Sequence, residues 1–282
     1  MLDISQGLIM AGIVLLLADM AWCACAMFRR RGVLCDDRGV RRALSVLLVV
    51  ATAAVAALCG YIYSIHFLDA SIGVLVFAGA ALFTLALLWA ASHLRGMARR
   101  SMALLEAIVG VIEAGDPNLD GHSLHVRNLT MLLYENLPLR LRLHVHAGSL
   151  EYAALLLDVG KLGVPRAIIT KSGKLEPAEW DLVRRHPEIG MKILSPLKSF
   201  DRIALWIKYH HERVDGSGYY HLRGGEIPLA SRLIAVADTY SAITMDRSYK
   251  PSRAYDEAIA ELKLVAGTQL DAELVRIFCC IP

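Results

Sequence analysis

The sequence has no alternating pattern of apolar and polar residues, no internal repeat and no low-complexity linker, so we expect no half-buried β-strands. Its six cysteines do not have the spacing of a zinc site and imply no disulfide framework. The net charge of only +3 comes largely from arginines beside apolar runs, and it does not indicate a nucleic-acid partner. What remains is an all-α chain.

Three long apolar runs dominate the N-terminal third: residues 7–28, 43–63 and 72–92. Each has about 20 residues, and at about 1.5 Å per residue a helix of that length crosses a bilayer core of about 30 Å. The runs therefore predict a three-span transmembrane region over residues 1–94. No basic residue precedes the first run, which argues against a cleaved signal peptide.

Basic residues predict an orientation for these spans. Arginines are concentrated in residues 29–42 and 95–100, whereas residues 1–6 and 64–71 contain no Lys or Arg. The excess of basic residues on the cytoplasmic side of membrane proteins then places the N-terminus outside. We therefore expect a multi-pass protein of the inner membrane, with the lipid bilayer as a partner and residues 95–282 in the cytoplasm.

The remainder of the chain has helical spacing of its apolar residues throughout. Residues 95–115 are expected to form a helical connector into a domain over residues 102–282, and a homodimer through this connector is one hypothesis. Ser149 is a plausible N-cap for the helix that ends near Asp158. The expected helices of the domain cover residues 123–137, 149–159, 203–211, 230–245, 254–266 and 272–278, with another opening at residue 177.

The most informative motif is residues 209–219, which read YHHERVDGSGY. Adjacent imidazoles point in different directions, so the pair His210 and His211 suits two neighbouring metal ions better than an apolar core. The following Asp-Gly-x-Gly turn ends on an aromatic residue, which packing alone does not explain. This motif therefore indicates chemistry rather than structure.

Four further residues of metal-ligand type accompany this motif: His122, Asp158, His186 and Asp238. Asp158 closes an otherwise apolar helix and Asp238 lies inside another, and an unpaired carboxylate is costly to bury in either place. A metal ion supplies the missing partner, although a buried salt bridge would also explain either aspartate. Lys161 follows Asp158 by about one turn, where its charge can meet a phosphate. Together these residues predict a metal-dependent hydrolase site.

Residues 102–282 closely resemble the HD-GYP subgroup of the HD phosphohydrolase superfamily. The matching motifs are residues 153–165, 174–190, 210–219, 227–238, 246–251 and 267–271. The resemblance implies an α-helical HD-type domain, here placed after the three-span region. It also implies hydrolysis of the second messenger cyclic di-GMP with divalent metal ions, commonly iron or manganese.

Carried over residue by residue, the resemblance implies two sets of functional positions. The metal ligands would be His122, Asp158, His186, His210, His211 and Asp238. The contacts to the phosphates and bases of the nucleotide would be Lys161, Tyr219, Arg247 and Lys250. The expected catalytic residues are Asp158, as the carboxylate that bridges two metal ions, and Lys161.

The sequence departs from the family at several positions. Leu157 replaces the histidine of the His-Asp pair, and leucine cannot ligate a metal ion. Asn118 stands where the family has an additional glutamate ligand, Tyr220 replaces the proline of the Gly-Tyr-Pro motif, and Ser241 replaces a usual aspartate. We therefore expect an altered site with one or two ions.

The departures affect two metal positions differently. The position built from Asp158, His186 and His210 is expected to be intact, whereas the position that needs the missing imidazole is expected to be damaged. One hypothesis is that His125, one turn beyond His122, replaces that imidazole as a ligand. The alternative is a histidine that supports the site without ligating, or one at the surface.

Three functions stay open at this point. The first is a membrane-anchored, metal-dependent phosphodiesterase that opens cyclic di-GMP with an altered site. The second, favoured by Leu157, is an inactive receptor for cyclic di-GMP or for a partner protein on the same fold. The third is a hydrolase of another nucleotide or phosphoester. Retention of costly buried histidines and aspartates argues for metal or ligand binding without establishing turnover.

Overall fold

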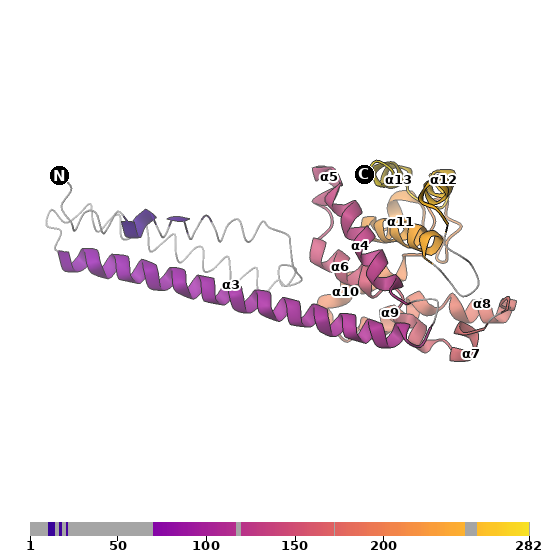
Figure 1. Ribbon diagram of the computed structural model, residues 1–282, viewed down its shortest axis with the longest axis horizontal. Helices are drawn as coiled ribbons and strands as arrows, with labels where there is room; N and C mark the ends of the chain where they lie inside the picture. Colours follow the sequence, from indigo (N-terminus) through magenta and orange to yellow (C-terminus); the bar gives the residue numbers. More distant parts are fainter. Residues whose placement is uncertain are drawn as a thin grey trace. The chain divides into compact units, whose positions relative to one another are not determined.

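The structure is a computed structural model that describes residues 11–14, 17, 18, 21, 70–116, 120–171, 173–245 and 253–281. The chain divides into two compact units, residues 1–100 and 101–282. The longest described helix is α3, Ala70–Glu113, which Figure 1 shows in purple.

The prediction of membrane spans meets a direct test in this structure. Among the residues described, no helix is both long enough and apolar enough to pass through a bilayer. The predicted localisation, a multi-pass protein of the inner membrane with its N-terminus outside, is therefore wrong. The run 72–92 is the first part of α3, which continues through charged residues to Glu113, so the run does not define a helix by itself. The runs 7–28 and 43–63 lie outside the described residues, apart from a few positions of the first.

The second unit is mostly helical, as the sequence predicts. Within the described residues its only β-type pairing is an isolated bridge between Ala266 and Leu270. After α3 the helices are α4 His122–Glu135, α5 Leu139–Arg142, α6 Ala147–Leu155, η2 Val159–Gly163, α7 Arg166–Ile169, α8 Pro177–Val183, α9 His186–Leu194, η3 Lys198–Phe200, α10 Asp201–Lys208, η4 Gly224–Glu226, α11 Leu229–Thr244, α12 Tyr255–Val265 and α13 Ala272–Phe278.

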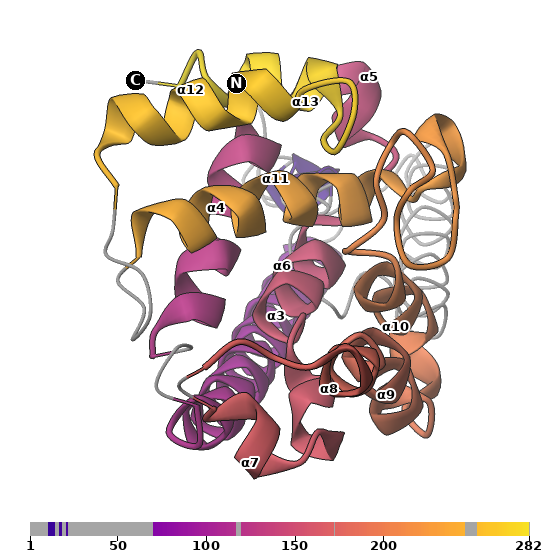
Figure 2. The ribbon, with the colours of Figure 1, turned by 90° about the vertical axis from the view of Figure 1, so that its right-hand side faces the viewer.

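The core of this unit forms where α4 packs against both α6 and α11 (Figure 2). Leu133 of α4, Leu150 of α6 and Leu233 of α11 are completely buried there. Each fully buried leucine contributes about 1.5–3 kcal/mol relative to an exposed one. Because α4 and α11 carry polar residues of the predicted site on the same helices, this packing also fixes where those residues lie.

A second contact holds η2 against α9, and a glycine makes it possible. A Cβ atom added to Gly160 would lie 1.8 Å from the carbonyl oxygen of His186 and 2.6 Å from the backbone nitrogen of Gly190. Only glycine therefore allows the backbone after Asp158 to approach the start of α9. This close approach brings Asp158 and His186 together.

One predicted helix differs in its limits, and the difference matters for the site. The helix expected over residues 149–159 runs instead over Ala147–Leu155, and its N-cap is His146, whose Nδ1 accepts a hydrogen bond from the backbone N–H of Ser149. The chain leaves the helix before Asp158. The aspartate therefore lies in the turn that leads into η2, where its carboxylate is presented to several elements at once.

Candidate metal centre

Three histidines from two segments form a cluster whose ligand atoms all lie within 4.8 Å of one another: His186, His210 and His211. His186 is the first residue of α9, and the adjacent pair follows the end of α10. The rings of His210 and His211 lie 3.8 Å apart between centroids, and that of His186 lies 5.3 Å and 5.1 Å from them. A group of this size and composition is able to hold a metal ion.

The hydrogen bonds of this cluster determine which ring nitrogens are available to a metal. Nδ1 of His186 lies 2.8 Å from the carbonyl oxygen of Val183, and Nδ1 of His210 lies 2.6 Å from that of Ile207. A carbonyl oxygen only accepts, so both Nδ1 atoms carry the proton. In a neutral ring the lone pair is then on Nε2, which is the nitrogen that a metal needs.

Burial keeps these lone pairs available. The Nε2 atoms of His186 and His210 are buried and form no hydrogen bond. Burial lowers the pKa of His186 to about 4, so its ring is neutral near pH 7. Two buried acceptors without hydrogen-bond donors are costly, and a divalent ion would satisfy them both. The cluster therefore fits the metal that the sequence predicts.

Asp158 lies between this cluster and two other groups of the site. Its Oδ1 is 3.3 Å from Nε2 of His186, and its Oδ2 is 2.9 Å from Nζ of Lys161 and 4.0 Å from Nε2 of His122. Burial acts to raise the pKa of the carboxyl group, but Lys161 and then the neighbouring histidines outweigh it and hold this pKa well below its ordinary value. Asp158 is therefore ionised, and its two oxygens face different groups of the site.

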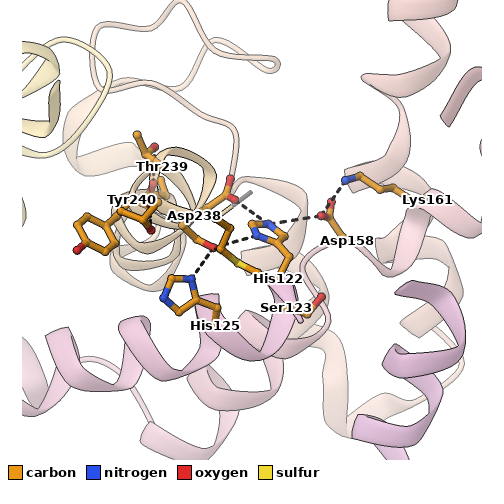
Figure 3. Close-up of polar contacts among 12 residues, drawn as sticks. His122, Ser123, His125, Asp158, Lys161, Asp238, Thr239 and Tyr240 are labelled. Atoms are coloured by element: carbon orange, nitrogen blue, oxygen red, sulfur yellow. Dashed lines mark hydrogen bonds and ion pairs between the residues drawn. The ribbon is translucent and has the colours of Figure 1, made fainter. Parts of the chain in front are cut away.

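His122 and Asp238 form a second pair close by, across α4 and α11 (Figure 3). Nε2 of His122 lies 3.1 Å from Oδ1 of Asp238. Burial raises the pKa of Asp238, yet its hydrogen bond and charge interaction with His122 more than offset this effect, so the pKa stays below its ordinary value. The structure thus brings together all six residues that the sequence predicts as metal ligands.

The start of α4 is held by a residue that the sequence analysis missed. Glu113, at the end of α3, is buried, and its two carboxylate oxygens accept hydrogen bonds from the backbone N–H groups of Gly121 at 3.2 Å and Ser123 at 2.8 Å. These bonds satisfy N–H groups that the first turn of a helix leaves without partners. Glu113 therefore fixes the position of His122, which lies between the two donors.

His125 lies on the opposite side of His122 from Asp158, as Figure 3 shows. Its Nδ1 is 3.0 Å from Oγ of Ser241 on α11. Burial, and then the nearby His122, lower its pKa. The hypothesis that His125 ligates a metal ion stays a prediction.

The Gly-Tyr loop is built around a buried acid. Glu212 accepts hydrogen bonds from the backbone N–H groups of Tyr220 at 2.6 Å and Leu222 at 2.7 Å. A Cβ atom on Gly218 would lie 2.7 Å from the backbone of Glu212, so a glycine is required at this close approach. The loop presents Tyr219 beside His211, with ring centroids 5.0 Å apart.

A cavity of about 510 Å³ opens over this site. The predicted residues His122, Asp158, Lys161, His210, His211, Tyr219 and Asp238 line it. Six further polar residues that the sequence analysis did not assign to the site also line the cavity: Glu212, Arg213, Thr239, Arg253, Glu261 and Gln269. Two predicted ligand-binding residues, Arg247 and Lys250, lie outside the described residues.

Comparisons with known proteins agree with this geometry. The family model described as HD domain matches residues 93–274. The 3′3′-cGAMP-specific phosphodiesterase 3 of Vibrio cholerae serotype O1 is 37% identical over 61% of this chain and 38% of its own length. The cyclic di-GMP phosphodiesterase of Thermotoga maritima is 38% identical over 48% of this chain and 37% of its own length.

These matches cover only part of each relative. The chain covers less than two-fifths of the length of either relative. A solved structure of Bd1817, an HDG"Y"P protein from Bdellovibrio bacteriovorus, aligns with a TM-score of 0.46 at 20% identity, over 57% of this chain and 52% of that one, which is too weak to carry an argument. The family model covers more than half of the chain, so this chain belongs to the HD domain family.

Proposed function

We propose that this chain is a metal-dependent phosphodiesterase that hydrolyses a cyclic dinucleotide, with cyclic di-GMP as the substrate. The observation that carries the proposal is the buried cluster of His186, His210 and His211, whose available lone pairs lie beside Asp158 and Lys161. The names of two relatives, a 3′3′-cGAMP-specific phosphodiesterase and a cyclic di-GMP phosphodiesterase, support the substrate class.

The residues of the site divide the work of hydrolysis. A bound divalent ion supplies a Lewis acid and lowers the pKa of a water molecule toward neutrality. Asp158, which is ionised, and the neutral ring of His186 would hold such an ion. Lys161 keeps its proton, because the effect of Asp158 outweighs burial and raises its pKa, so it can attract a phosphate oxygen. Water adds its hydroxyl to the phosphorus, and its proton ends on the leaving ribose oxygen, which gives the linear dinucleotide.

The number and identity of the ions are part of the proposal. Asp158, His186 and His210 would hold one ion, commonly iron or manganese in this family. A second ion would need His122 and Asp238. We expect it to bind more weakly, because Leu157 is buried in the core at 1% exposure and offers no ligand. We therefore propose one tightly bound ion and a weaker second one.

The cavity supports a substrate larger than a single phosphate. Its volume of about 510 Å³ is within the range of small-molecule sites, about 300–1,000 Å³. Tyr219 lies on its wall and offers a ring against which a base can stack. Arg247 and Lys250 are proposed to meet the phosphates and bases, as the family resemblance implies.

The test uses the full chain, purified without oxygen. Metal per chain is measured in the same sample as the cleavage of cyclic di-GMP, 3′3′-cGAMP and a simple aryl phosphodiester, with iron or manganese supplied. We expect cleavage of the cyclic dinucleotide, lost in His210→Ala. His144→Ala is a matched control, because His144 is an exposed histidine of the same domain whose Nδ1 bonds the carbonyl oxygen of Arg140 at the surface.

A receptor without turnover is the second candidate, and Leu157 is the observation that favours it. Leu157 replaces a metal ligand with a fully buried apolar side chain, so the second ion has one protein ligand fewer. Metal and cyclic di-GMP binding without any cleavage would establish this alternative. Cleavage of only the aryl diester would point instead to a phosphodiesterase with another substrate.

A further inference from the structure

One hydroxyl group joins the two histidines of α4. Oγ of Ser241 lies 3.0 Å from Nδ1 of His122 and 3.0 Å from Nδ1 of His125. Ser241 is completely buried, and His122 is 2% exposed. Sδ of Met245 lies 3.3 Å from the same oxygen and is a weak acceptor. The side chains of Ser241, His122 and His125 are therefore joined by hydrogen bonds through one hydroxyl group.

The donor and the acceptor of each hydrogen bond in this series can be assigned. Nε2 of His122 lies 3.1 Å from the ionised carboxylate of Asp238, which only accepts, so Nε2 carries a proton. In a neutral ring Nδ1 of His122 then accepts, and the hydroxyl of Ser241 donates to it. The oxygen of Ser241 is left to accept from Nδ1 of His125. The hydrogen bonds run in one direction, from His125 through Ser241 and His122 to Asp238.

A metal ion at His122 demands the opposite arrangement. The ion needs the lone pair of Nε2, so the proton of the neutral ring must be on Nδ1 and point at Ser241. The hydroxyl of Ser241 must then donate either to the weak acceptor Sδ of Met245 or to Nδ1 of His125, and the nitrogen is the stronger acceptor once His125 takes its other tautomer. Because imidazole can both donate and accept, His125 keeps Ser241 paired in both states.

We propose that Ser241 and His125 are a positioning pair for the metal ligand His122, and that their hydrogen bonds reverse direction when a metal binds. His125 then acts through Ser241 and is not itself a ligand. The inference rests on the metal site of the proposed function but is independent of turnover. The proposal accounts for the hydrogen bond that joins His125 to Ser241 beside His122.

Metal affinity tests the pair. Mn²⁺ is titrated calorimetrically into the metal-free full chain and into Ser241→Ala, His125→Leu and the double variant. Loss of a partner that orients a ligand typically weakens metal binding about 10–100-fold. We expect a loss of that size in each single variant, with the number of ions per chain unchanged. The double variant should be no weaker than the worse single variant, because both remove one interaction.

Two further variants distinguish positioning from general damage. His125→Asn keeps a rotatable amide that offers a donor or an acceptor near the position of Nδ1, so we expect it to recover most of the affinity that His125→Leu loses. His144→Leu is the control and should bind like the unmodified chain. If His125→Leu loses one ion per chain and Ser241→Ala does not, His125 is a ligand and the proposal is overturned.

The ring tautomers give a readout that needs no activity. Long-range ¹H–¹⁵N correlation spectra report which nitrogen of a histidine carries the proton. We expect His125 to be protonated on Nδ1 without metal and on Nε2 with diamagnetic Zn²⁺. An unchanged tautomer overturns the reversal, as does a chain that binds no metal. A chain that binds metal as described but cleaves nothing refutes only the proposed function.

Discussion

Replacing Gly160 by alanine is expected to disrupt the site through backbone contact alone. The added Cβ would lie 1.8 Å from the carbonyl oxygen of His186, and also 2.7 Å from its carbonyl carbon and 2.6 Å from the nitrogen of Gly190. These are backbone atoms, so no side-chain rotation relieves the clash. Helix η2 and helix α9 must therefore separate, and His186 moves away from Asp158.

The size of the effect follows from these distances. Overpacking a well-packed core costs about 1–3 kcal/mol, and a clash with backbone places Gly160→Ala at about the upper limit. For a domain of about 150–250 residues, each kcal/mol lowers the melting temperature by about 2–4 °C. We expect a fall of about 6–12 °C. Metal affinity should also fall by about 10-fold or more, because the orientation of a ligand is lost.

Two other glycines provide graded controls. A Cβ on Gly190 would lie 3.3 Å from the side chains of Ile207 and Val159, so Gly190→Ala should cost about 1 kcal/mol, at the low end for overpacking. A Cβ on Gly225 would meet nothing within 4 Å, and Gly225→Ala should stay within about 0.5 kcal/mol. Calorimetric melting of all three variants, with and without Mn²⁺, measures the series. Gly160→Ala with the stability and metal affinity of Gly225→Ala would refute the reasoning.

Three further outcomes are expected. Glu212→Ala leaves the partly buried N–H groups of Tyr220 and Leu222 without their acceptor. An unsatisfied buried donor costs about 1–3 kcal/mol, so urea unfolding should show a loss toward the lower end of that range. A midpoint equal to that of the unmodified chain would contradict this. Glu113→Ala removes the cap of α4 and should lower the free energy of unfolding by about 0.5–2 kcal/mol. It should also weaken Mn²⁺ binding at His122. Unchanged Mn²⁺ binding would show that the cap does not position the ligand. Mn²⁺ at 100 times its dissociation constant should stabilise the metal-free chain by about 2.7 kcal/mol in a thermal melt, and a chelator should reverse this. His210→Ala should lose most of the stabilisation. An equal stabilisation of the variant would show that the ion binds at another place.

Most of the helices could be predicted because their apolar residues repeat with helical spacing. The helix expected over residues 230–245 is α11, Leu229–Thr244, and the one expected over 272–278 is α13, Ala272–Phe278. Membrane crossing could not be predicted in the same way. The run 72–92 is apolar in sequence, but the helix that contains it ends only at Glu113.

The supporting residues of the site were harder to predict than its ligands. His210 and His211 stand out because two adjacent histidines have no packing explanation. Glu113 and Glu212 are ordinary acids in sequence, and only the structure shows them buried against backbone N–H groups. Ser241 was read as the loss of an aspartate, whereas its hydroxyl proves to link two histidines.

The residue types and their spacing along the chain were enough to predict helices with apolar faces, and histidines and aspartates whose burial calls for a charged partner such as a metal ion. Local spacing carries that information, because residue type and periodicity act over a few turns. The available nitrogen of each imidazole, and the residues that orient the ring, became known from the folded structure alone. Both depend on contacts between segments far apart in the chain, such as Gly160 against His186 and Ser241 against His122 and His125. No local pattern records such contacts, since each is set by how whole helices pack.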